Sequence, residues 1–181
     1  DAAVRNLREL GADAHVELGR ALVMHANLLL GEDQQDAALA ASTEAVQLLR
    51  PLAREHAFDY LWGLLAHADL MASLDRNEEA VAAADEGLAT PQAQQPDYTS
   101  VRLELLGARA RGLAGLLRYA EAEPVFAQIV DMNKAAFGFE SPQSRYWRYQ
   151  RAQLMDWMGQ LEEAHAEIER LLNVPASGAE H

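Results

Sequence analysis

The stretch HADLM at residues 67–71 decides the fold of this chain, because closely similar stretches recur at a fixed interval. The others are HANLL at 25–29, RARGL at 109–113 and RAQLM at 151–155, and successive copies begin 42 positions apart. A repeat of roughly 20–50 residues indicates a supersecondary unit that cannot bury its apolar face alone. Neighbouring units must therefore stack into one continuous core, as they do in solenoid proteins.

Each unit is predicted to be a helical hairpin. Leu22, Ala26 and Leu29 share one face at helical spacing, and a second run with the same spacing follows a break at 31–33. We expect first helices at about 14–30, 57–73, 99–115 and 142–157. We expect second helices at about 34–49, 77–89, 119–136 and 161–172. Ser141 is the expected N-cap of the last first helix, with Pro142 at its first position.

The repeats are expected to form a single domain over residues 1–172. Their predicted bounds are about 14–50, 57–90, 99–136 and 142–172. AVRNLREL at 3–10 matches AVQLLRPL at 45–52, so residues 1–10 are predicted to be the remnant of a helix from a preceding repeat. The chain is accordingly predicted to be a fragment of a longer protein. Residues 173–181 are polar and contain Pro175 and Gly178, which predicts a flexible tail.

The composition narrows the class of protein. Half of the residues are hydrophobic, and good helix formers dominate, which favours an all-α chain. A net charge of −13 argues against nucleic acid and anionic membranes as partners. The chain has no cysteine, which excludes disulfides and agrees with a reducing compartment. Since no apolar run approaches the length of a membrane span, we expect a cytoplasmic protein.

Neither catalysis nor metal binding is predicted. The sequence has no glycine-rich phosphate loop, no nucleophile elbow and no zinc-binding His-Glu-x-x-His helix. His25 and His67 occupy equivalent positions in adjacent repeats, but neither has a carboxylate three or four residues further along the same helix face. We therefore expect no catalytic residue, no metal site and no cofactor.

Two segments identify the type of repeat. RYAEAEPVF at 118–126 and GQLEEA at 159–164 resemble the turn and second helix of tetratricopeptide repeats (TPRs). The period of 42 exceeds the common period of about 34. It is similar to that of the long repeats in kinesin light chains and in many bacterial kinases and regulators. The resemblance implies a right-handed α-solenoid of about four hairpins plus a partial N-terminal helix.

The resemblance also implies that a concave groove, lined by first helices, binds a protein or peptide. Trp, Tyr and Arg often anchor interfaces, because they bury large area at low entropic cost. Packing of Trp62 and Trp157 between helices is the alternative for those two residues. The positions that the resemblance assigns to the groove hold Arg20, Val23, Met24, Asn27, Trp62, Leu65, Asp69, Glu104, Arg111, Tyr146, Tyr149, Gln153 and Trp157.

The sequence thus predicts a protein- or peptide-binding module of a larger bacterial regulatory protein, such as a kinase or transcriptional regulator. The expected ligand carries apolar and basic side chains, because the array is acidic. The alternative is a structural arm that mediates self-association or holds an attached domain inactive. Since a terminal repeat normally needs a polar cap, the first hairpin is also expected to fray or to mediate homodimerisation.

Overall fold

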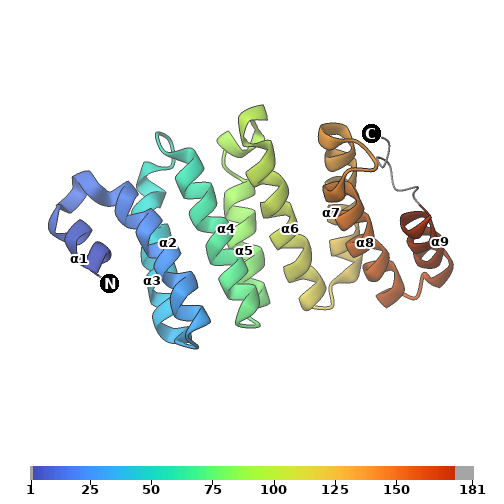
Figure 1. Cartoon of the computed structure of the whole chain (residues 1–181), viewed down its shortest axis with the longest axis horizontal. Helices are drawn as coiled ribbons and strands as arrows, with labels where there is room; N and C mark the ends of the chain where they lie inside the picture. Colours follow the sequence, from blue (N-terminus) through green and yellow to red (C-terminus); the bar gives the residue numbers. More distant parts are fainter. Residues whose placement is uncertain (1, 174–181) are drawn as a thin grey trace, which may run out of the picture.

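The computed structural model describes residues 2–173, and over this range it contains helices and no strand. Figure 1 shows the first helices of the repeats side by side in chain order, between α1 at one end and α9 at the other. The helices are α1 (Ala2–Glu9), α2 (His15–Gly31), α3 (Gln35–Leu49), α4 (Ala57–Ser73), α5 (Asn77–Leu88), α6 (Thr99–Gly115), α7 (Tyr119–Phe137), α8 (Pro142–Trp157) and α9 (Leu161–Leu172).

The helix bounds agree with the sequence prediction. Helices α4, α6, α8 and α9 begin and end at the predicted residues, and the other predicted helices differ by at most one residue at either end. The Ser141 side chain accepts a hydrogen bond from the Ser144 backbone N–H, which confirms the predicted N-cap. Residues 174–181, predicted to form a flexible tail, lie outside the described residues.

One type of turn joins the two helices of every repeat. The second residue after each first helix has a positive φ, and these residues are Asp33, Asp75, Leu117 and Gly159, each 42 positions from the next. In each turn the following backbone N–H bonds back to a carbonyl five residues earlier, as from Gln160 to Met155 at 2.9 Å. This is the Schellman motif, which closes a helix and reverses the chain direction.

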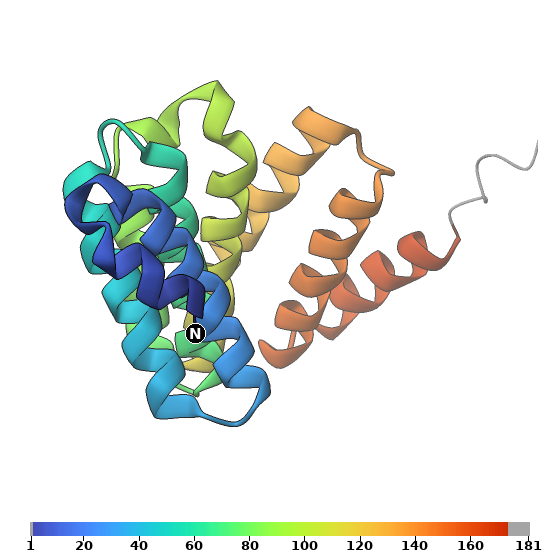
Figure 2. The same cartoon turned by 60° about the vertical axis from the view of Figure 1, so that its left-hand side comes forward.

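Small residues allow the helices to approach closely. The recurring Ala26, Ala68, Ala110 and Ala152 are almost fully buried. Each helix packs against the next one along the chain, and α2 with α4 and α4 with α6 also pack directly. In Figure 2 the last hairpin, α8 and α9, projects to one side of the earlier hairpins. The structure is therefore an α-solenoid whose buried apolar side chains form successive clusters along the array.

The ends of the array differ. Helix α1 packs against α2 and buries Val4 beside Leu18 and Leu22, so the first hairpin is partly covered. Helix α9 packs on α8, and Leu161 and Leu172 are exposed on it. Two short 3-10 helices, Gln92–Gln94 and Pro96–Tyr98, fill the proline-containing connection before α6.

Candidate functional site

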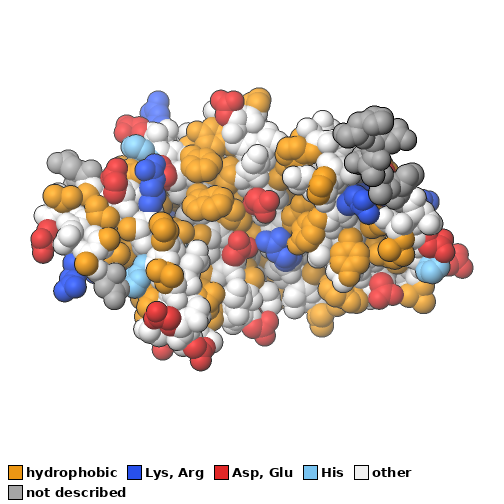
Figure 3. All heavy atoms as spheres, viewed as in Figure 1, with side chains coloured by type: hydrophobic (Ala, Val, Ile, Leu, Met, Phe, Trp, Pro, Cys, Tyr) orange, Lys and Arg blue, Asp and Glu red, His pale blue; other side chains and the backbone are white. Residues whose placement is uncertain are grey.

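The exposed surfaces of α2, α4, α6 and α8 form the candidate site, which we call the first-helix face. Because the repeat is regular, side chains 42 positions apart occupy the same place on successive helices. Figure 3 shows hydrophobic side chains gathered over α4 and α8, with charged side chains between them over α6. Two rows run along this face: Arg20, Trp62, Glu104 and Tyr146 form one, and Asn27, Asp69, Arg111 and Gln153 form the other.

Helix α4 contributes an exposed aromatic pair. Trp62 is about half exposed, and its ring stacks on Phe58 with centroids 6.2 Å apart and planes 11° apart. Phe58 lies one helical turn before Trp62 and was not among the predicted site residues. A Phe four residues before a Trp in a first helix is the sequence signal that could have identified it. Trp62 is therefore not packed between helices, contrary to the alternative prediction for this residue.

Helix α6 places an ion pair in the middle of the face. Arg111 Nη2 donates to Asp69 Oδ1 of α4 at 3.0 Å, and the Arg111 guanidinium lies 5.8 Å from the ring centroid of Trp147. The Trp147 ring itself fits against Gly107, which has no side chain to occupy that space. Trp147 is buried, and sequence analysis missed it because its equivalent in the preceding repeat, Leu105, shows no site character.

Helix α8 supplies three further aromatic side chains. Tyr146 is half exposed and meets Trp147 edge to face, with centroids 5.1 Å apart. The Tyr149 hydroxyl accepts a hydrogen bond from Gln153 Nε2 at 3.0 Å. Trp157 lies beside a tyrosine ring of α7, with centroids 5.9 Å apart, and remains more than half exposed. These side chains are therefore available to a ligand at the C-terminal part of the face.

The remaining predicted residues lie in different environments. Arg20 is held by Asp59, with Nε to Oδ1 at 2.6 Å, and this hydrogen bond raises the pKa of Arg20. Met24 and its neighbour Asn27 are exposed on α2. Leu65 and Val23, by contrast, are buried in the core and present almost no surface. The structure thus separates these two residues from the exposed set.

A hollow of about 620 Å³ adjoins the face between α8 and α9. Tyr149, Gln153 and Asp156 of α8 line it, opposite Leu161 and Ile168 of α9. Of the predicted residues, only Tyr149 and Gln153 line this hollow.

The histidine positions show no metal-site geometry. The Ser42 hydroxyl lies 2.9 Å from His67 Nδ1, and burial lowers the pKa of His67, which favours the neutral ring. Among residues 2–173 no group of three His, Asp or Glu side chains could hold a metal ion. Within the same range no helix is long and apolar enough to cross a membrane.

Known structures share this architecture. No family model and no curated protein sequence matches the chain. BtubC (BKLC) from P. vanneervenii superposes with a TM-score of 0.78 at 15% identity, over 97% of this chain and 72% of that one. A Podosopora anserina protein described as a kinesin light chain with nearly identical TPR-like repeats gives 0.66 at 19% identity, over 88% and 72%. A point variant of that protein gives 0.68 over the same shares of the two chains. The chain is therefore a helical repeat array with the TPR-type fold.

Proposed function

We propose that the first-helix face binds a segment of a partner protein that carries a basic side chain between apolar ones. Glu104 is the supporting observation. It is exposed on α6 and forms no hydrogen bond or ion pair with any described residue. It occupies the repeat position that Trp62 holds on α4 and Tyr146 holds on α8.

The chemistry of this row sets the expected ligand. A cationic side chain would pair with the free carboxylate of Glu104, while its apolar neighbours pack on Trp62 and Tyr146. Aromatic anchors supply most of the affinity in such interfaces, because they lose much exposed area on binding. Complementary charge chiefly raises the association rate and selects the partner. At a general level, the TPR-type fold of the array supports a role in protein contacts.

The test uses a peptide selected on the full chain from a displayed library, titrated against variants of the face. Replacing Trp62 or Tyr146 with Ala should cost about 1 kcal/mol or more of binding free energy. Glu104→Gln should weaken binding at low salt and make the affinity less dependent on salt concentration. The reason is that the variant lacks the charge attraction that salt screens. Phe137→Ala removes an exposed aromatic of α7 outside the face and is the matched control. Equal affinity of all four variants and the parent, with unchanged helical content, would contradict the proposal.

A second candidate function is self-association through the end of the array. It is favoured by the exposure of Leu161 and Leu172 on α9, the last described helix, which packs mainly on α8. Leu10 and Leu28 are also exposed at the other end, where dimerisation was predicted. Sedimentation over a range of concentrations distinguishes the ends: Leu161→Glu should abolish association through α9 and leave association through α2 unchanged.

We further infer that the array is the partner-binding part of a bacterial cytoplasmic regulatory protein, such as a kinase or transcriptional regulator. This rests on the Ala-, Leu- and Arg-rich composition and on the long repeat period. The open reading frame in the source genome tests it directly, because an adjoining kinase or DNA-binding domain would support the inference and an adjoining unrelated enzyme would contradict it.

A further inference from the structure

Arg148 stands where every other repeat has a core leucine. The equivalent residues are Leu22, Leu64 and Leu106, all buried. Arg148 is only 3% exposed, so the guanidinium takes the place of an apolar side chain rather than turning out to solvent. The last repeat therefore departs from the others at a position that the fold uses for packing.

The residue that pairs with Arg148 also differs from its equivalents in the other repeats. Glu167 accepts a hydrogen bond from Arg148 Nε at 2.5 Å, and its equivalents are the buried Ala41, Ala83 and Val125. Burying an ion pair costs desolvation energy, and an apolar pair is often at least as stable in its place. Because three repeats fold with the apolar pair, stacking does not require the charged one, and a different role is the simpler explanation.

The Arg148 guanidinium has a nitrogen that forms no hydrogen bond. Its Nη1 is buried without a hydrogen-bond partner among the described residues, and Glu140 Oε1 lies 3.7 Å away, beyond hydrogen-bond distance. Glu167 is shared, because its second oxygen accepts from Arg170 Nη1 at 3.0 Å. The Arg148 guanidinium also lies 3.8 Å from the ring centroid of Phe139. Arg148 and Arg170 thus share Glu167, and Arg148 Nη1 remains a buried donor without a hydrogen bond.

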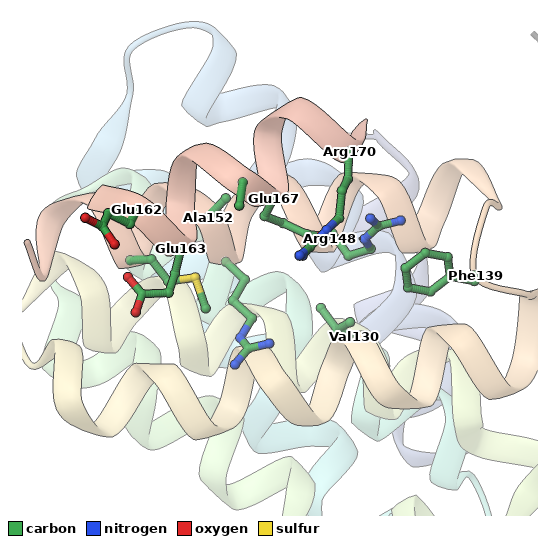
Figure 4. Close-up of a pocket in the computed structure, with 11 residues that line it drawn as sticks. Val130, Phe139, Arg148, Ala152, Glu162, Glu163, Glu167 and Arg170 are labelled. Atoms are coloured by element: carbon green, nitrogen blue, oxygen red, sulfur yellow. Dashed lines mark hydrogen bonds and ion pairs between the residues drawn. The ribbon is translucent and has the colours of Figure 1, made fainter. Parts of the chain in front are cut away.

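These groups line one end of a cavity of about 590 Å³ between α7, α8 and α9. Figure 4 shows Arg148, Arg170 and Phe139 toward one end, with Glu162 and Glu163 toward the other. A cavity of this size is within the range of small-ligand sites, and its lining combines apolar side chains with charged ones. Between the two ends, Val130, Ala152, Met155 and Ala166 supply the apolar part of the lining. Arg151 also lines the cavity, and its guanidinium is paired with Glu123, with Nη2 to Oε1 at 2.5 Å.

We propose that this cavity binds a carboxylate on a short apolar chain, with the carboxylate against Arg148 and Arg170 and the chain along the apolar part of the lining. A guanidinium presents parallel N–H donors that match the two oxygens of a planar carboxylate. Two guanidiniums that share one glutamate have donors left for a second acceptor. The ligand is either a free small carboxylate or the C-terminus of a peptide, and both present the same group.

Matched acid and amide probes test the proposal on the whole chain. Hexanoate is compared with hexanamide, and acetyl-Leu-Leu with its C-terminal amide, by calorimetry and by chemical shifts of Met155 and Ala152. We expect each acid to bind at least about tenfold more tightly than its amide, since removing the charge removes the bidentate pair. Saturation by hexanoate would indicate a free-carboxylate site, and saturation by the dipeptide acid alone would indicate a C-terminus.

The variants use residues that the chain itself has at equivalent positions. Arg148→Leu with Glu167→Val recreates the pair that the preceding repeat has at 106 and 125, and Arg170→Gln recreates the residue at 128. The double variant should fold with unchanged helical content and lose acid-specific binding, and Arg170→Gln should weaken it. Arg118→Gln removes an exposed arginine outside the cavity and should change nothing. Equal binding of acids and amides, no saturable binding of any probe, or unchanged binding in the folded double variant would overturn the proposal.

Discussion

Single residues decide how much strain each turn carries. In successive repeats, the turn position with a positive φ is occupied by Asp33, Asp75, Leu117 and Gly159. The left-handed conformation costs an ordinary L-residue roughly 1–2 kcal/mol, whereas glycine adopts it freely. Leu117 has φ 58° and is 72% exposed, so it gains little packing in return. Its turn is therefore the most strained of the four by residue type.

Leu117→Gly should stabilise the chain. We expect the free energy of unfolding to rise by about 0.5–1 kcal/mol, because relief of the turn exceeds the entropy that glycine adds to the unfolded state. Urea denaturation measures the change. Gly159→Ala at the equivalent position is the reverse control and should lower stability by about 1 kcal/mol. A destabilised Leu117→Gly variant would show that the packing contacts of the Leu117 side chain contribute more to stability than relief of the turn does.

One carboxylate links stability to pH. Burial raises the pKa of Glu86. Hydrogen bonds from Arg50 (Nε to Oε1 at 2.8 Å) and from the Tyr60 hydroxyl together lower it by more than burial raises it, so the net shift of the pKa is downward. A carboxylate with a lowered folded-state pKa stabilises the fold above its ordinary pKa, and this contribution disappears as pH falls through the folded-state value.

Glu86→Gln should therefore lower stability at neutral pH and reduce the loss of stability between pH 7 and acid conditions. Chemical denaturation at a series of pH values gives the slope for parent and variant. Glu78→Gln, which removes an exposed carboxylate outside the cluster, should leave the slope nearly unchanged. If both variants gave the parent's pH profile, the cluster of Arg50, Tyr60 and Glu86 would not contribute to acid sensitivity.

At the scale of elements, the contact of the α8 side chain Trp147 with α6 depends on a missing side chain. The Trp147 ring occupies the space beside Gly107 and also meets Phe126 of α7, with centroids 6.2 Å apart. The equivalent glycine is absent from the earlier repeats, where Val23 and Leu65 fill the position. The placement of Trp147 on α8 therefore depends on the absence of a side chain at Gly107 on α6.

Gly107→Ala should displace Trp147 and shift α8 relative to α6. The new Cβ would lie 2.3 Å from the ring, so we expect a loss of about 1–3 kcal/mol of stability and a change in tryptophan fluorescence. Gly31→Ala is the control, because a Cβ there meets nothing within 4 Å. Trp147→Leu in the Gly107→Ala background should recover stability, and failure to do so would mean that the clash lies elsewhere.

At the scale of the whole molecule, contacts run between neighbours along the array. Helix α6 packs on α4, α5 and α7, whereas α9 packs mainly on α8. In such a structure, stability is a sum of repeat and interface terms, and the end units open first.

Hydrogen exchange followed by mass spectrometry should consequently find the amides of α4 and α6 most protected and those of α9 least. Carboxylate binding in the cavity between α7, α8 and α9 should slow exchange in α9 in particular, because the ligand would join α9 to α7. Uniform protection from α2 to α9 would instead indicate one cooperative unit.

The sequence by itself determined the repeat, the helix bounds and the turns. These follow from the 42-residue spacing, from Ala68 and its equivalents, and from local rules of capping and chain reversal, which act within a few residues. The resemblance to tetratricopeptide repeats indicated which side chains lie on the first-helix face, and the periodicity places equivalent residues on the same surface. Burial of Val23 and Leu65 was not foreseen, since the sequence of a single helix does not reveal how closely its neighbours pack against it.

Only the tertiary structure decided which side chains meet. The contact of Arg111 with Asp69 depends on how helices from different repeats approach, as does the seat of the α8 tryptophan on α6. The same holds for Arg148 and Glu167, which are ordinary surface residue types in sequence and become a buried pair beside a cavity in space. Such contacts depend on helix spacing and tilt, which follow from the summed packing of the whole array and not from any local segment.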